Sequence, residues 1–158
     1  MYVPSQQMGA DMRRWEGSSL KVYGDSRNPP LPTQGVGRHH GVNWGDPDIT
    51  PDTEALWLAE DLQTGYSDAL TLFPNLDGFD LVRKEALISV AFNMGLEKLS
   101  QFVPFIEHVN AEEWDEAAYH LMVNMKHHLT PYLLEVGARA EETALRICSG
   151  NILGEFAL

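Results

Sequence analysis

The chain has little cysteine, few basic residues and no long apolar run, and each shortage excludes a class of protein. Its single cysteine, Cys148, cannot form a disulfide within the chain. It has 11 basic side chains against 23 acidic ones and a formal net charge of −12, which argues against nucleic-acid binding because phosphates require patches of Lys and Arg. No stretch approaches the roughly 20 apolar residues that cross a bilayer. We therefore expect no nucleic-acid partner and no membrane insertion.

The six histidines form no recognisable metal motif. The pairs His39-His40 and His127-His128 lack the His-Glu-x-x-His spacing. Adjacent residues of a helix also point in different directions, so each pair would need ligands from elsewhere in the chain. We therefore expect no metal and no cofactor.

A short helix that ends in a carboxylate is predicted near the N-terminus. Met8, Met12 and Trp15 recur at i, i+4 and i+7, the spacing of one apolar helix face. Glu16 then lies in the last turn and is followed by Gly17, a residue typical of helix ends. A carboxylate at this end faces the negative pole of the helix dipole, which disfavours its charged form. Glu16 is therefore a candidate proton donor.

A second carboxylate, Asp25, follows Glu16 by nine residues. Leu20 to Tyr23 are predicted to form a short strand, and Asp25 lies where this strand gives way to a polar turn, so it should be solvated and ionised. Glycosidases need one carboxyl group kept neutral and one kept charged, since one protonates the leaving oxygen and the other activates water or attacks carbon. The two carboxylates therefore predict glycoside hydrolysis.

A proline-rich turn and a returning strand are predicted after Asp25. The strand covers residues 33–37, and its two glycines allow close approach of a ligand. Thr50-Pro51 is a helix-start signal, with Thr as cap and Pro in the first turn. Helices are predicted at 51–72, from 79 or 80 to 95, at 103–109, at 111–124 with Asn110 as cap, and from Thr130-Pro131 to Gly150.

At these residues the chain resembles the phage-type lysozymes, glycoside hydrolase family 24. In that family a helix ends in Glu-Gly, an Asp follows nine residues later, and a Thr precedes a Gly-x-Gly-His segment. Here one extra residue, Arg38, stands before His39, and eight positions rather than six separate Thr33 from Asp25. The resemblance continues in the family's order through Ile49-Thr50-Pro51-Asp52, Ala86-Leu87-Ile88, Phe92-Asn93-Met94-Gly95, Trp114-Asp115-Glu116-Ala117-Ala118 and Thr130-Pro131.

The resemblance implies an α+β, lysozyme-like fold, with residues 1–158 forming a single catalytic domain. A small N-terminal lobe with a helix and an antiparallel sheet is expected, its sheet part at about 17–50. A long connecting helix at about 51–72 should join it to a mainly helical C-terminal lobe at about 73–150, with which the N-terminal helix is grouped.

The resemblance also implies an endolysin-type muramidase that hydrolyses the β-1,4 bond between N-acetylmuramic acid and N-acetylglucosamine in peptidoglycan. Glu16 is expected to be the general acid, Asp25 to assist the attack of water, and Thr33 to hold that water. The predicted site residues are, for catalysis, Glu16, Asp25 and Thr33; for substrate binding, Gly35, Asn93 and His120; and as a structural pair, His39 and Asp61.

The expected partners are the glycan strands of peptidoglycan, and a monomer is expected. The chain should be made in the cytoplasm of a host bacterium without a signal peptide and should reach the cell wall after release by another factor. The alternative is a peptidoglycan-binding protein that keeps the lysozyme fold with weak or lost hydrolysis. The longer turn before Thr33 and the Tyr132-Leu133 pair, where the family commonly has Asn-Arg after Thr-Pro, leave this alternative open.

Overall fold

The structure, a computed structural model, describes residues 2–124, 126 and 128–151. By its internal contacts the chain divides into two compact units, Met1–Gln63 and Thr64–Leu158. The long helix α2 (Pro51–Leu72) contributes residues to both units. Helices and a small antiparallel sheet together make a mixed α+β, lysozyme-like fold, which confirms the predicted class.

The first unit contains α1 (Gln6–Glu16) and the first part of α2. Helix α1 begins after Ser5, whose hydroxyl accepts a hydrogen bond from the backbone N–H of Met8 at 3.0 Å. Met8 and Met12 are buried, so the apolar face predicted from their spacing is the packed face. An ion pair between Arg13 and Glu54 ties α1 to the first part of α2.

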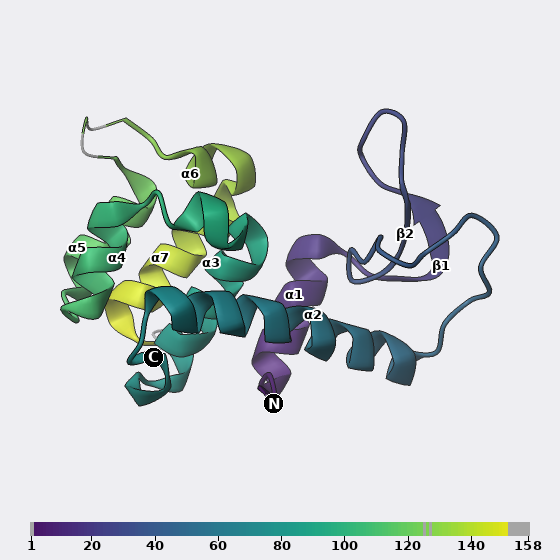
Figure 1. Cartoon of the computed structure of the whole chain (residues 1–158), viewed down its shortest axis with the longest axis horizontal. Helices are drawn as coiled ribbons and strands as arrows, with labels where there is room; N and C mark the ends of the chain where they lie inside the picture. The colour runs from purple at the N-terminus through teal and green to yellow at the C-terminus, as the bar shows by residue number, and fades with distance from the viewer. Residues whose placement is uncertain (1, 125, 127, 152–158) are drawn as a thin grey trace, which may run out of the picture. The chain divides into compact units, whose positions relative to one another are not determined.

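The sheet is a hairpin of two antiparallel strands, β1 (Ser19–Gly24) and β2 (Pro32–Gly35) (Figure 1). Tyr23 is paired with Thr33 and Ser19 with Gly35, with an irregularity in register between these two points. The strand predicted before Asp25 is confirmed. The returning strand begins one residue earlier and ends two residues earlier than predicted.

The second unit is helical, and α3 (Leu81–Leu99) is its central helix. Leu87, Ile88, Val90 and Ala91 of α3 are fully buried, which confirms the prediction that this segment is the central apolar helix. Gly95 interrupts the helix with a positive φ of 73°, at the residue where the sequence predicted its end.

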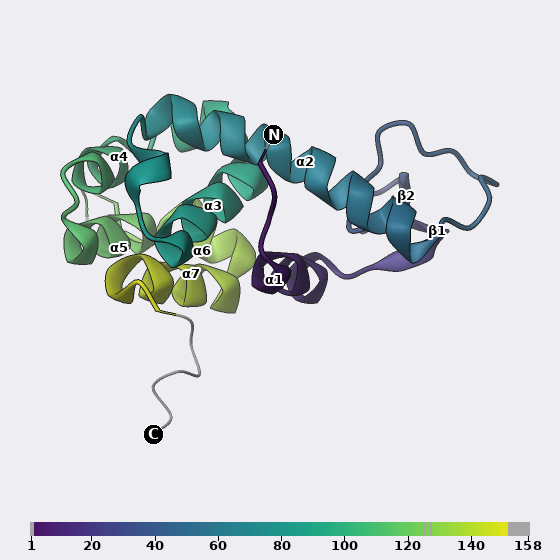
Figure 2. The same cartoon turned by 90° about the horizontal axis from the view of Figure 1, so that it is seen from below.

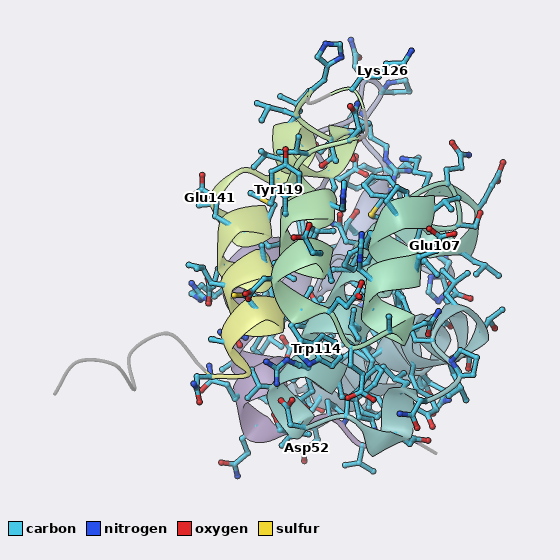
Figure 3. The ribbon with its side chains drawn as sticks, turned by 90° about the vertical axis from the view of Figure 1, so that its left-hand side faces the viewer. Asp52, Glu107, Trp114, Tyr119, Lys126 and Glu141 are labelled. Atoms are coloured by element: carbon cyan, nitrogen blue, oxygen red, sulfur yellow. The ribbon has the colours of Figure 1, made fainter. Side chains whose placement is uncertain are left out.

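The described part of the second unit also contains the short 3-10 helix η1 (Leu76–Gly78) and the helices α4 (Val103–Asn110), α5 (Trp114–Met122), α6 (Pro131–Val136) and α7 (Ala138–Ser149). Helix α7 packs against both α3 and α5 (Figure 2). Helices α4 and α5 lie side by side, with Glu107 on α4 and Trp114 and Tyr119 on α5 (Figure 3).

Several helices of the second unit differ in extent from the predictions, and α5 covers residues 114–122 rather than 111–124. The last helix is divided into α6 and α7 at Gly137, whose positive φ of 49° breaks the helical backbone. Glu113, not Asn110, stands at the N-cap position of α5 and makes no capping hydrogen bond with its side chain. The Asn110 side-chain amide instead donates a hydrogen bond to the Leu72 carbonyl at 3.0 Å. Among the described residues, no helix is both long and apolar enough to span a bilayer.

Candidate functional site

The candidate proton donor, Glu16, is the last residue of α1. Gly17 follows it with φ 75° and ψ 172°, a backbone conformation that is essentially restricted to glycine. The chain therefore leaves the helix abruptly, and the half-buried Glu16 side chain lies at the junction between α1 and the hairpin. This is the position that the apolar spacing of the helix and the Glu-Gly pair predicted.

A buried carboxylate that the sequence did not single out fixes the chain on both sides of Glu16. Glu54, in the first turn of α2, accepts hydrogen bonds from Arg13 Nε at 3.0 Å and Nη2 at 2.9 Å, and also from the Ser18 hydroxyl. Burial alone would raise the pKa of Glu54, but the hydrogen bonds from Arg13 and Ser18 and the Arg13 charge outweigh it, so the pKa is lowered. An ionised Glu54 thus anchors residues on either side of Glu16.

The second candidate carboxylate, Asp25, accepts hydrogen bonds from the backbone N–H groups of Leu31 at 2.9 Å and Arg27 at 3.1 Å. The Arg27 guanidinium lies 3.1 Å from its other oxygen. The pKa of Asp25 is lowered, and the largest cause is the hydrogen bond from the Leu31 N–H. Desolvation opposes this effect, while the Arg27 N–H bond and the charges of Arg27 and His39 add to the lowering. The expectation of an ionised Asp25 agrees with this geometry.

Tyr23 links the two carboxylates electrostatically. Burial raises the pKa of the Tyr23 hydroxyl, and the negative charges of Asp25 and then Glu16 raise it further. Since such an effect requires proximity, both carboxylates lie within electrostatic reach of one phenol, which stays protonated and can donate a hydrogen bond. Both carboxylates belong to the first unit and act on the same phenol.

Thr33 and Gly35 lie on the returning strand and both are buried. The Thr33 hydroxyl donates a hydrogen bond to the Leu31 carbonyl at 3.1 Å. Gly35 has a positive φ of 63°, and a side chain added there would lie 3.6 Å from Glu54 and Trp57. Leu31 therefore connects Thr33 to Asp25, since it also donates its N–H to the Asp25 carboxylate.

The predicted structural pair of His39 and Asp61 is wrong. Asp61 instead accepts hydrogen bonds from Arg38 Nε at 3.0 Å and Nη2 at 2.7 Å, and His40 lies farther away, at 3.7 Å. A guanidinium is always charged and matches a carboxylate with two parallel N–H groups, so it is the stronger partner. The extra residue Arg38 thus replaces the histidine, and His39 lies edge-on to His40.

The other two predicted substrate-binding residues, Asn93 and His120, belong to the second unit. Asn93 is half-buried on α3, two residues before the break at Gly95. His120, on α5, helps to line a cavity of about 440 Å³. The remaining lining residues are Gln101, Phe102, Pro104, Val123, Asn124, Lys126, Thr130 and Pro131.

One cluster of metal-ligating side chains occurs among the described residues, formed by His108, Glu116 and His120. The histidine pairs considered in the sequence do not contribute to it, and His127 lies outside the described residues. The sequence does carry one sign of the cluster, because Glu116 and His120 are four residues apart and share a helix face. The third residue, on another helix, could not be found from local spacing.

A helix ending in Glu16, a hairpin that holds a charged Asp25 and a long helix leading into a helical unit define a lysozyme-like protein of the α+β class. A model of the phage lysozyme family matches residues 13–131, and the chain belongs to this family. No curated protein matches the chain. Membership of the phage lysozyme family implies a glycoside hydrolase that degrades peptidoglycan in the manner of an endolysin.

Proposed function

We propose that the protein is an endolysin-type muramidase that hydrolyses the β-1,4 bond between N-acetylmuramic acid and N-acetylglucosamine. The observation that carries this proposal is the pair of carboxylates near Tyr23, one at the end of α1 and one kept charged by the hairpin turn. Such a pair can divide the two proton transfers of glycoside hydrolysis without a cofactor. The family match supports the reaction class.

In the proposed mechanism Glu16 is the general acid and protonates the glycosidic oxygen as positive charge develops at the anomeric carbon. The charged Asp25 assists the attack of water, and Thr33 holds that water. The Thr33 hydroxyl donates a hydrogen bond to the Leu31 carbonyl, so its oxygen lone pairs remain to accept a hydrogen bond from water. Inversion is proposed, for which the two carboxyl groups should be about 6.5 to 9.5 Å apart.

Substrate contacts are proposed for Gly35, Asn93 and His120. Gly35 is buried and has no side chain to shield its backbone groups, Asn93 offers both a donor and an acceptor, and His120 lines a cavity. We also propose that the protein acts as a monomer and that its partner is the glycan strand of peptidoglycan. Substitution of Asn93 or His120 by Ala should raise KM more than it lowers kcat.

The direct test is release of reducing sugar from purified peptidoglycan by the wild type, Glu16→Gln and Asp25→Asn. General acid–base catalysis contributes about 10² to 10⁴ in rate, and Glu16→Gln should lose at least this much. Glu97→Gln and Asp52→Asn, at exposed residues, are matched controls and should keep normal activity. Several salt concentrations are needed because the net charge of −12 opposes approach to a polyanionic wall.

The products identify the bond and the stereochemistry. Borohydride reduction should label N-acetylmuramic acid at the new chain ends, and NMR during the first turnovers should show the α-anomer. New N-acetylglucosamine ends, or anhydro sugars without a reducing end, would contradict the proposed reaction.

A peptidoglycan-binding protein without hydrolysis is the second candidate. The observation in its favour is that Thr33 is only 3% exposed, which restricts the access of water to its hydroxyl. Retained sedimentation with peptidoglycan but no sugar release by the wild type, over all salt concentrations, would favour this candidate.

A further inference from the structure

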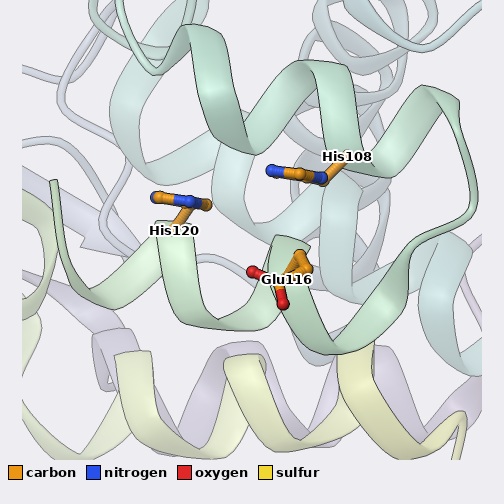
Figure 4. Close-up of side chains that lie close together, drawn as sticks. All are labelled: His108, Glu116 and His120. Carbon is orange, nitrogen blue, oxygen red and sulfur yellow. The ribbon is translucent and has the colours of Figure 1, made fainter. Parts of the chain in front are cut away.

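Three side chains from two helices of the second unit point toward one another (Figure 4). They are His108 on α4 and Glu116 and His120 on α5. Each offers one ligand atom, and these atoms lie within 4.8 Å of one another. Zn–N and Zn–O bonds are about 2.0 to 2.2 Å long, so one ion can contact all three atoms after small rotamer adjustments.

The packing of α4 against α5 brings the cluster together. Glu116 and His120 are separated by one helical turn and lie on the same face of α5. Only three residues, Ala111 to Glu113, connect α4 to α5, and this short connection places His108 opposite that face. The two imidazole rings are parallel, with an interplanar angle of 1° and centroids 5.2 Å apart.

Hydrogen bonds hold both histidines in the tautomer that binds a metal. His120 Nδ1 lies 3.3 Å from the Val123 carbonyl, which can only accept, so this nitrogen carries the proton. His108 Nδ1 lies 2.6 Å from a carboxylate oxygen of Glu113. In both rings Nε2 is then the nitrogen with a free lone pair. A carboxylate or carbonyl bound to the far ring nitrogen is the usual outer partner of a metal-ligating histidine.

The ligand set indicates which ions fit. Two imidazole nitrogens and one carboxylate suit Zn²⁺ and its neighbours among the divalent transition metals, whereas Ca²⁺ and Mg²⁺ prefer oxygen ligands throughout. Glu113 and Glu116 supply the negative charge that offsets a divalent cation. Three protein ligands leave the fourth position of a tetrahedral zinc ion for water or another ligand.

We propose that His108, Glu116 and His120 form a binding site for a zinc-class divalent ion. The ion would join α4 to α5 and fix the orientation of His120, which also lines the cavity of the second unit. This site shares His120 with the proposed substrate contacts but contains neither Glu16 nor Asp25, so binding of the ion can be measured without any reference to hydrolysis.

The test is equilibrium binding of Zn²⁺ to the full chain without a histidine tag, after removal of metal with a chelator. We expect one ion per chain with a dissociation constant below about 10 µM, and a higher Tm when Zn²⁺ is added because the ion binds only the folded state. Co²⁺ bound in its place should give the intense visible absorption of a four-coordinate ion.

Matched variants locate the site. His108→Gln and His120→Gln should each weaken Zn²⁺ binding at least about tenfold, and Glu116→Gln should weaken it less, because an amide oxygen can still coordinate. The controls are His128→Gln and Glu107→Gln, exposed residues of the same unit, which should bind as the wild type does. Circular dichroism checks that each variant is folded.

Two results would overturn the proposal. One is failure of the wild type to bind Zn²⁺ at 100 times the expected dissociation constant, which is decisive whatever the variants do. The other is wild-type affinity retained in both folded His108→Gln and His120→Gln, which would place the bound ion elsewhere.

Discussion

Asp25 and Leu31 close the hairpin with two hydrogen bonds that run in opposite directions. The Asp25 N–H donates to the Leu31 carbonyl at 3.1 Å, and the Leu31 N–H donates to the Asp25 carboxylate at 2.9 Å. The side chain proposed to assist water is therefore also the side chain that shapes the turn. Its charge and its hydrogen-bonding geometry can be separated by two substitutions.

Asp25→Asn should keep the turn, because an amide oxygen still accepts the N–H groups of Leu31 and Arg27. Asp25→Ala removes this acceptor and should have the lower Tm of the two. Both variants should lose peptidoglycan hydrolysis by at least about 10²-fold. Thermal unfolding and sugar release measure the two effects. Equal melting temperatures for the two variants would show that the carboxylate does not stabilise the turn.

The pH dependence of Asp25 has a defined sign. Its folded-state pKa is lowered, so the ionised group stabilises the folded protein above the unfolded value of about 3.9. This contribution should be lost as pH falls through the lower folded pKa. Carbon-detected NMR titration of the Asp25 carboxyl group should give a midpoint below that of an unstructured Asp peptide. A midpoint at or above the peptide value would contradict the hydrogen-bond assignment.

The ion pair of Arg13 with Glu54 should stabilise the end of α1. Glu54 is 6% exposed and Arg13 is 38% exposed, so we expect a coupling energy of about 1 to 2 kcal/mol in a double-mutant cycle of Glu54→Gln and Arg13→Gln. The lowered pKa of Glu54 means that this stabilisation is present above the unfolded pKa and disappears as pH falls through the folded one.

Urea denaturation at pH 7 and at low pH measures the Arg13–Glu54 coupling. Glu60→Gln is a control on the same helix, because Glu60 pairs with Arg38 but is 54% exposed, and such surface pairs contribute about 0 to 1 kcal/mol. A coupling energy of Arg13 with Glu54 that is smaller at pH 7 than that of Arg38 with Glu60 would show that Glu54 does not anchor the chain around Glu16.

Gly17→Ala should cost about 1 to 3 kcal/mol of stability through backbone strain alone. No atom lies within 4 Å of the position that an added Cβ would occupy, so no side-chain clash contributes. Activity should fall more than stability explains, since the strain would shift Glu16. Gly45→Ala is the control, because Gly45 has φ 90° and equally open surroundings but lies away from Glu16 in the sequence. Equal activity of the two folded variants would argue against this positioning role.

Cys148 should react slowly with thiol reagents. Its Sγ donates to the Asp115 carboxylate at 2.9 Å, and this hydrogen bond, followed by burial and the Asp115 charge, raises the pKa of the thiol. Since the thiolate is the nucleophile, Asp115→Asn should raise the rate of alkylation at pH 8 several-fold. Mass spectrometry of timed iodoacetamide reactions measures this rate. An unchanged rate in Asp115→Asn would refute the proposed effect of the carboxylate.

Local signals in the sequence predicted the elements around the site. Thr50 caps α2 as expected, with its hydroxyl accepting the N–H of Thr53 at 3.1 Å. The position of Glu16 at a helix end and of Asp25 after a strand followed from spacing within about ten residues. Such features depend on neighbours in the chain, which the sequence displays directly.

Features that depend on distant residues were not predictable in the same way. Asp61 pairs with Arg38 because a guanidinium competes better than an imidazole for a carboxylate, and spacing alone could not decide between adjacent residues. Glu54 and its bonds to Arg13 and Ser18 join positions more than 30 residues apart. The His108 cluster likewise required the packing of two helices.

The closure between Asp25 and Leu31 also means that the extra length of the turn is contained within residues 26–30, all of which are exposed. The register of the two strands is set outside the turn, by the pairing of Gly24 with Pro32 and of Tyr23 with Thr33. The tip of the turn is therefore a point at which a foreign peptide can be inserted. The Asp25 carboxylate keeps its two N–H donors if Arg27 and Leu31 remain at the two edges of the insertion.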